Sequence, residues 1–465
     1  MDFRQHTVAE LAAAVRSGAR PAAEMTDAAL ERIASLNGTI NAFVSVDEDR
    51  ARAAAAALDE RIAAGEDVGP LAGMPIGVKD LEDVEGFVTT NGSAVHAEDA
   101  PATQDSLLVE RLKAAGCVVV GKTNTPEFGF KGDTTNSVFG PTRNPWNTER
   151  SPGGSSGGSG AALASGMVPL ATGSDGGGSI RIPGSLCGLS TFKASLGRVP
   201  TRTAPGWLDL AVSGPMTLRT RDVALALDAV VGPDPGDPAS LPAPARPWID
   251  GVDAAALPDR VAWSPTLGYG TVDAEIARVC AAAVAALADA GVEVVEVDGV
   301  IDEDPGLDWA RISGLCNLRS LDDVVGTERW ELVDAELRAL IDLVQELTDP
   351  VALIKAMDRG FELHQQVTVA LDGVDVLLSP TVAGQTGRVG EFGTLDGEPD
   401  GNWVQFTYPF NMTGSPAGTV MAGVTADGMP VGLQVIGSHL ADAEVLAAMA
   451  GFESVLGIEE LARVD

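Results

Sequence analysis

Ser151-Pro-Gly-Gly-Ser-Ser-Gly-Gly-Ser-Gly-Ala161 and Gly173-Ser-Asp-Gly-Gly-Gly-Ser-Ile-Arg181 are two glycine- and serine-rich stretches separated by a short apolar segment. Glycine adopts positive φ freely and lets backbone N–H groups approach a ligand with no side chain between them. Flexible linkers seldom flank an apolar run such as 161–170. The two stretches therefore predict ordered loops that surround a ligand.

This glycine pattern occurs in several kinds of site, which the neighbouring residues distinguish. A phosphate-binding P-loop requires a lysine after its glycines, and no lysine lies within 143–192. The GxGxxG spacing of dinucleotide-binding folds is also missing from these stretches. Residues 153–157 formally match the GxSxG nucleophile elbow, but an elbow follows a hydrophobic strand and 143–152 is turn-like. A Ser-His-Asp hydrolase is disfavoured too, because none of the four histidines has motif-like neighbours (His6, His96, His364 and His439).

The chain has 465 residues with 31 basic and 66 acidic side chains, giving a net charge of −35 with neutral histidines. This charge repels phosphate groups, so we expect no nucleic-acid partner and no docking on anionic membranes. No metal-ligand cluster, signal peptide or apolar run of about 18 residues is recognisable. The cysteines are scattered and form no CxxC pair, which argues against structural zinc and disulfides (Cys117, Cys187, Cys280 and Cys316). The sequence therefore predicts a cytoplasmic protein without a metal.

Hydrophobic patterning predicts one α/β unit over residues 1–465. Thr7 and Glu10 are spaced as a capping box for the first helix. Further along, a helix predicted over 106–115 precedes a buried strand at 117–120, and such alternation favours stacked layers of helices and strands. The predicted parts are a helical N-terminal region (1–65), a core (66–230), a mostly helical insertion (248–372) and a C-terminal part of the core (373–465).

Several spaced motifs resemble those of the amidase signature enzymes. The main ones are Gly77-Val-Lys-Asp80, the glycine-rich stretch at 153–161 and Gly177-Gly-Ser-Ile-Arg181. Supporting pieces follow in the family's order (121–127, 144–146, 409–416 and 427–434). Several motifs in the right order are more specific than any single glycine pattern. The resemblance implies a mixed, twisted central sheet flanked by helices, with the glycine-rich loops at its centre.

The resemblance also implies a Ser–cis-Ser–Lys triad, with Ser179 as nucleophile, Ser155 as bridging serine and Lys79 as base. The two serines are 24 residues apart (179 − 155), as in the family pattern. A serine hydroxyl is a weak nucleophile that needs a base, and a lysine is a base only when it is uncharged. Burial lowers a lysine pKa below its ordinary value of about 10.4, whereas the negative field of this chain raises it. We therefore expect a shielded Lys79 and activity that rises into alkaline pH.

The residues before the nucleophile are expected to form an oxyanion hole, in which backbone N–H groups stabilise the tetrahedral intermediate (Gly176, Gly177, Gly178 and Ser179). Gly176 departs from the family pattern, which has threonine or isoleucine at this position, so the hole is expected to be wider or looser. Asp175 and Arg181 match residues that hold the loop in place.

The implied activity is hydrolysis of an amide C–N bond through an acyl-enzyme, without a cofactor, and esters and carbamates react by the same route. The motifs define the substrate pocket less well. Gly129 and Phe130 are expected on the acyl side, and Arg202 and Trp207 at the rim, although ordinary packing explains these four residues equally well. Apolar candidates predominate, which favours a neutral, partly hydrophobic small-molecule amide. A homodimer is the family-level expectation.

Two alternative functions stay open. The same family includes the glutamine-hydrolysing subunit of tRNA-dependent amidotransferases, which acts with partner subunits, and the charge of −35 opposes direct tRNA contact. The other alternative is a non-catalytic binding protein on the same fold. The presence of Lys79, Ser155 and Ser179 together argues against it.

Overall fold

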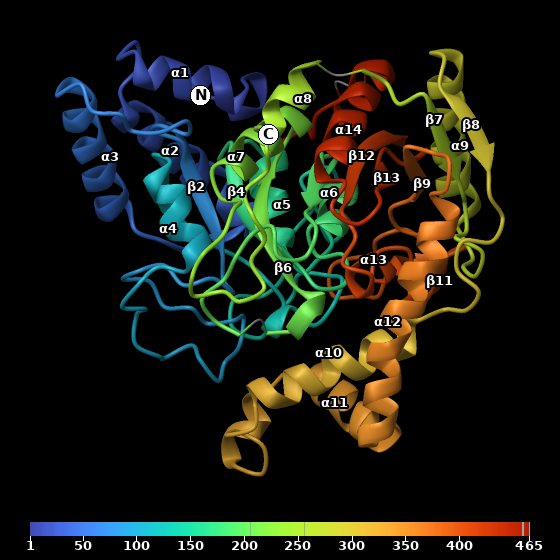
Figure 1. Cartoon of the computed structure of the whole chain (residues 1–465). Helices are drawn as coiled ribbons and strands as arrows, with labels where there is room; N and C mark the ends of the chain where they lie inside the picture. The colour runs from blue at the N-terminus through green and yellow to red at the C-terminus, as the bar shows by residue number, and fades with distance from the viewer. Residues whose placement is uncertain (205, 255, 458–459, 465) are drawn as a thin grey trace.

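Two mixed β-sheets form the centre of the structure, a computed structural model that describes residues 1–204, 206–254, 256–457 and 460–464 (Figure 1). The first sheet has the order β1-β3-β2-β4-β6, and the second has the order β5-β12-β13-β9-β7-β8. The edge strands β6 and β5 lie against each other, so one sheet follows the other across the molecule. This mixed α/β architecture confirms the predicted fold class. The strands are β1 (Phe43–Val46), β2 (Pro75–Lys79), β3 (Val118–Thr123), β4 (Leu170–Asp175), β5 (Thr191–Lys193), β6 (Val212–Thr217), β7 (Arg260–Trp263), β8 (Glu293–Glu296), β9 (Val376–Pro380), β12 (Ala417–Val424) and β13 (Pro430–Ile436), with a small hairpin of β10 (Thr394–Leu395) and β11 (Glu398–Pro399) outside the two sheets.

The direction of the strands in the first sheet places the candidate site. Strand β2 is parallel to both β3 and β4, while β6 is antiparallel to β4. Because β2, β3 and β4 run in the same direction, their carboxyl ends meet at one edge of the sheet. Lys79 ends β2, Thr123 ends β3 and Asp175 ends β4. All three side chains are buried at this edge.

Two short helices follow the glycine-rich stretches into the interior. Helix α5 packs on β2 and β4, α6 packs on β12 and β13, and every residue of both helices is buried. A Cβ on Gly158 would collide with the backbone of Asn124, so glycine is required for this close packing. The α-helices are α1 (Val8–Arg16), α2 (Ala22–Ile40), α3 (Glu48–Ala63), α4 (Leu107–Ala114), α5 (Gly157–Ala164), α6 (Arg181–Cys187), α7 (Thr220–Asp228), α8 (Trp248–Ala254), α9 (Ala274–Asp289), α10 (Gly306–Ser320), α11 (Ala335–Leu347), α12 (Pro350–Ala370), α13 (Pro409–Met412) and α14 (Asp442–Leu456).

Local sequence signals in the N-terminal half describe the observed elements well. Thr7 and Glu10 form the predicted capping box, in which Thr7 Oγ1 accepts from the Glu10 N–H and the Glu10 carboxylate accepts from the Thr7 N–H. The helix predicted over 106–115 is α4, with Ser106 at its N-cap, and the buried strand after it is β3. These elements form where local propensity and burial agree.

The segment 248–372, predicted to be a mostly helical insertion, has two different parts. Strands β7 and β8 belong to the second sheet, and helix α9 packs on β9, β12 and β13 of that sheet. Helices α10, α11 and α12 instead extend away from the sheets, at the bottom of Figure 1. They have an apolar cluster of their own, which reaches back to Phe130 and Trp207 in the signature core. Among the described residues, no helix is both long and apolar enough to cross a membrane.

Candidate active site

Lys79 lies at the buried end of β2 and contacts three serine hydroxyls. Its Nζ is 2.7 Å from Ser155 Oγ, 2.9 Å from Ser156 Oγ and 3.0 Å from Ser174 Oγ. The lysine is fully buried, and Ser155 follows a cis peptide bond from Gly154. The amine therefore lies within hydrogen-bonding distance of hydroxyls from both glycine-rich stretches.

The surroundings of Lys79 favour its uncharged form. Burial lowers the pKa of Lys79 from 10.5 to about 7, although the negative charges of Asp175 and Glu82 act in the opposite direction. The low-dielectric site outweighs these two carboxylates because the amine is removed from water completely. A large fraction of Lys79 is then neutral near pH 7 and able to accept a proton, as its predicted role as a base requires.

Ser179 lies between β4 and α6, at the edge of a cavity of about 500 Å³. It is 7% exposed, and Ser155, Ser174 and Gly129 line the same cavity. The Ser179 carbonyl accepts from the Ser156 N–H at 3.2 Å, which joins the two glycine-rich stretches. The cavity thus brings Ser155 and Ser179 to one space, with Lys79 directly behind Ser155.

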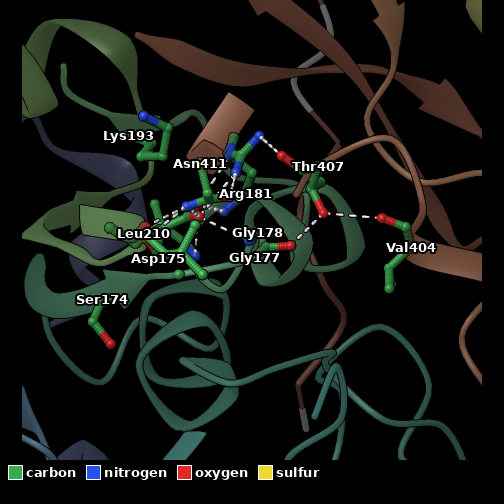
Figure 2. A network of polar contacts seen from close by, with 12 residues as sticks. Ser174, Asp175, Gly177, Gly178, Arg181, Lys193, Leu210, Val404, Thr407 and Asn411 are labelled. Atoms are coloured by element: carbon green, nitrogen blue, oxygen red, sulfur yellow. Dashed lines mark hydrogen bonds and ion pairs between the residues drawn. The ribbon is translucent and has the colours of Figure 1, made fainter. Parts of the chain in front are cut away.

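A buried ion pair holds the loop that precedes Ser179 (Figure 2). The Asp175 carboxylate accepts from Nε and Nη2 of Arg181, each at 2.9 Å, and from Asn411 Nδ2 at 2.8 Å. These partners keep the pKa of Asp175 well below its usual range, even though burial alone would raise it. Arg181 Nη1 also donates to the Thr407 carbonyl and to Gln434 Oε1. Asp175 and Arg181 therefore act on the shape of the loop, as predicted from their positions.

The structure gives Gly178 a different task from the predicted one. Its N–H donates to Asp175 Oδ1 at 2.7 Å and is used within the loop, rather than being directed to an oxyanion. Gly178 has a φ of +122°, and a Cβ there would collide with Thr407 Oγ1, so this position requires glycine for the turn. Gly176, Gly177 and Ser179 carry the other N–H groups of the predicted oxyanion hole.

Gly176, the departure from the family pattern, makes room for an aromatic side chain. A Cβ on Gly176 would lie 2.5 Å from Cε3 of Trp207, which lines the cavity. The Gly176 carbonyl accepts from Trp309 Nε1 at 2.8 Å. The two indole rings contact each other edge to face, with centroids 5.8 Å apart. The space of the missing side chain is thus filled by Trp207, and Trp309 links the Gly176 carbonyl to α10.

Two of the four predicted pocket residues line the cavity and two do not. Gly129 and Trp207 are on its wall, but neither Phe130 nor Arg202 is among the described residues that line it. Phe130 is buried in the apolar cluster of α10 and α11. Arg202 lies at the surface, where its guanidinium forms ion pairs with the carboxylates of Glu110 and Asp234.

Several residues of the site were not found from the sequence. Ser156 and Ser174 contact the Lys79 amine and lie inside the glycine-rich stretches, so their nearness in sequence to Ser155 and Ser179 was the only available signal for them. Asn317 and Ser320 come from α10 and line the cavity, because α10 packs against Phe130 and Trp207 of the core. Cys316, which precedes Asn317 in the same helix, is 5% exposed and packs among apolar side chains.

Comparison with known proteins agrees with this geometry. The Amidase family model matches residues 24–446 of the chain. The chain belongs to the amidase family. It is 39% identical to an acylamidase of Rhodococcus erythropolis, over 96% of this chain and 94% of that protein. It is 35% identical to a subunit of the glutamyl-tRNA(Gln) amidotransferase of Salinispora tropica, over 98% of both chains.

The fold of the amidase agrees with a solved relative of the same class. The crystal structure of a bacterial aryl acylamidase of the amidase signature family superposes with a TM-score of 0.91 at 30% identity, covering 97% of this chain and 96% of that one. The protein is therefore an amidase-signature hydrolase that acts on amide C–N bonds. A Ser–cis-Ser–Lys triad is typical of this family, and in this chain the buried Lys79 amine lies 2.7 Å from the hydroxyl of Ser155, which follows a cis peptide bond.

Proposed function

We propose that this amidase hydrolyses a neutral, partly hydrophobic amide through an acyl-enzyme on Ser179, with Ser155 as proton relay and Lys79 as base. One observation carries the proposal: a buried lysine amine lies 2.7 Å from Ser155 Oγ, and Ser155 and Ser179 line one cavity. Uncharged Lys79 takes the Ser155 proton, Ser155 takes the Ser179 proton, and Ser179 Oγ attacks the carbonyl carbon.

The same groups account for the later steps. The negative charge on the carbonyl oxygen is stabilised by N–H groups of Gly176, Gly177 and Ser179. When the tetrahedral intermediate collapses, the C–N bond breaks and the proton held by Lys79 passes through Ser155 to the leaving nitrogen. Water then attacks the acyl carbon and gives a proton through Ser155 to Lys79. When the second tetrahedral intermediate collapses, this proton returns through Ser155 to Ser179, and the acid is released. Esters and carbamates fit the route because only the leaving group differs.

The cavity wall supports a neutral substrate. Leu81, Leu108, Phe128, Val199 and Trp207 provide apolar surface. Of the described residues that line the cavity, none is a lysine or an arginine, and the Nδ1 of His96 on the wall already lies 2.8 Å from Asp99 Oδ2, so a substrate carboxylate finds no free lysine or arginine partner there. Glu82 is on the wall, with one oxygen held by Ser213 Oγ at 2.5 Å, and its negative charge repels a carboxylate further. Free glutamine, which carries an α-carboxylate, is therefore the less favoured substrate.

We also propose that the enzyme acts in the cytoplasm as a homodimer without a nucleic-acid partner. The charge of −35 supports the last point. The outer face of α12 supports a dimer, since it exposes large apolar side chains, among them Val351 at 62%, Ile354 at 57% and Phe361 at 69%. Sedimentation of the wild type and of Phe361→Asp tests this, with a dimer expected only for the wild type. A monomeric wild type would contradict it.

The catalytic proposal is tested with a panel of aryl amides, esters, carbamates and glutamine, given to the isolated chain. We expect turnover of aryl amides and none of glutamine. Ser179→Ala should lose activity at least 1,000-fold, because the residual rate of a triad without its nucleophile is small. Ser35→Ala, which removes an exposed hydroxyl far from the triad in sequence, is the matched control and should be unchanged. Equal activity in wild type and Ser179→Ala would contradict the proposal, and glutamine turnover would favour the amidotransferase-type alternative.

A further inference from the structure

Helix α10 brings an amide side chain to the wall of the cavity that holds Ser155 and Ser179. Asn317 lines this cavity although it lies in the helical segment that extends away from the sheets. The side chain is 1% exposed. A buried primary amide has two N–H donors and a carbonyl acceptor, each of which needs a hydrogen-bond partner. A donor or acceptor without a partner therefore indicates which kind of group the site is missing.

The orientation of the Asn317 amide is determined by Trp207. The Trp207 Nε1–H donates to Asn317 Oδ1 at 2.9 Å. An indole nitrogen can only donate, so the oxygen of the amide must face the ring and the NH₂ group must face away from it. Trp207 is itself held against the catalytic loop by Trp309, whose Nε1 donates to the Gly176 carbonyl. These contacts fix the position of the Asn317 amide relative to the loop that precedes Ser179.

The nitrogen of the same amide has no partner. Asn317 Nδ2 is buried and makes no hydrogen bond to any described residue. A buried donor without an acceptor is unfavourable, and buried polar groups in native proteins are seldom left in this state without a functional reason. The missing element is an acceptor, and the cavity is the space from which a substrate would supply it.

We propose that Asn317 is a substrate-binding residue whose NH₂ group donates to an uncharged oxygen acceptor of the substrate, outside the scissile amide. The inference rests on the proposed function and narrows it. The preferred substrates are amides with a carbonyl or ether oxygen in the acyl or the amine part. A substrate N–H or ammonium group at that place would face a donor and be rejected.

The test uses two matched pairs of anilides. In the first pair the acyl group is methoxyacetyl or butyryl, and in the second the aniline carries a 4-methoxy or a 4-ethyl group, so an oxygen replaces a methylene. Asn317→Asp keeps an oxygen for Trp207 and removes both donors. Ser320→Ala is the control, since Ser320 also lines the cavity but its hydroxyl already donates to the Cys316 carbonyl at 3.1 Å. Comparing variants within a pair cancels the intrinsic reactivity of each substrate.

We expect the wild type to prefer the oxygen-containing member of at least one pair by about tenfold or more in kcat/KM. Asn317→Asp should reduce this preference to within about twofold, and Ser320→Ala should keep it. Turnover of the methylene members by Asn317→Asp shows that the variant is folded. If that variant does not fold, Trp207→Phe, which releases the amide from its orientation, is expected to weaken the preference instead.

Two results would overturn the inference: a wild type with no preference in either pair, or variants of Asn317 and Trp207 that keep the full preference. Both are distinct from a failure of the proposed function, in which the wild type would hydrolyse neither member of either pair.

Discussion

The protonation of Lys79 makes a quantitative prediction about how the amidase responds to pH. An ordinary lysine with a pKa of 10.5 is about 0.03% neutral at pH 7, whereas a pKa of about 7 makes half of it neutral. Burial therefore raises the fraction of active base more than 1,000-fold at neutral pH. Each pKa unit of this shift corresponds to about 1.36 kcal/mol of free energy that favours the neutral amine over the charged one. Because the neutral amine is the reactive form, activity must increase as pH rises through the pKa of Lys79.

The assay is kcat/KM for an aryl amide between pH 5 and 10. We expect a roughly tenfold rise per unit below about pH 6, a midpoint near pH 7 and a plateau above about pH 8. Lys193 is the matched control, because burial also lowers the pKa of Lys193 to about 7, yet its Nζ donates to the Ser415 carbonyl instead of to the triad. Lys193→Met should keep the midpoint. A profile already flat below pH 6, or one still rising between pH 9 and 10, would refute Lys79 as the base.

Three further perturbations follow from contacts around the catalytic loop. Glu82→Gln removes a negative charge that raises the pKa of Lys79, so the midpoint of kcat/KM against pH should move to lower pH, and an upward shift would contradict this. Trp309→Phe removes the bond to the Gly176 carbonyl that orients the next peptide N–H; kcat should fall about tenfold with KM within twofold, and an effect on KM alone would argue against it. Gly178→Ala places a Cβ against Thr407 at a φ of +122°, so we expect a loss of about 1–3 kcal/mol in the free energy of unfolding and at least a hundredfold loss of kcat; normal values of both would show that the turn tolerates a side chain.

The central part of the fold could be predicted because its signals are local. The capping box at Thr7, helix α4 and strand β3 depend on residues close together in the sequence. The motif around Lys79 and the glycine-rich stretches indicated which loops surround the site. Strands β7 and β8 were less visible, because each has only four residues and one or both ends carry charged side chains, as in Glu293 and Glu296.

Other parts of the site depend on contacts between distant residues. The N–H of Gly178 is used by Asp175, which no glycine pattern reveals. Asn317 lines the cavity with its amide oxygen bound to Trp207, 110 residues earlier, and Gly176 leaves space for that indole. Arg202, in contrast, was predicted at the rim of the pocket, but its guanidinium forms an ion pair with a carboxylate at the surface. Such partnerships follow from packing, which local sequence patterns do not encode.

The acidic character of the chain acquires a mechanistic meaning from the structure. A net charge of −35 favours protonated lysine, and Asp175 and Glu82 add to this tendency near Lys79. Complete burial of the amine nevertheless dominates, and Asp175 is also paired with Arg181 at 2.9 Å. The sequence-based expectation of a shielded lysine therefore agrees with the observed environment, and alkaline activation is predicted to be complete near pH 8 rather than pH 11.

The most direct test of the account is to find the serine that becomes acylated or phosphonylated. A fluorophosphonate probe reacts with an activated serine, and mass mapping of the digested protein identifies the modified residue. We predict a single adduct on Ser179 in the wild type, no adduct in Ser179→Ala and much slower labelling in Lys79→Ala. An adduct on Ser155 or another serine, or undiminished labelling of Ser179→Ala, would contradict the assignment of Ser179 as the nucleophile.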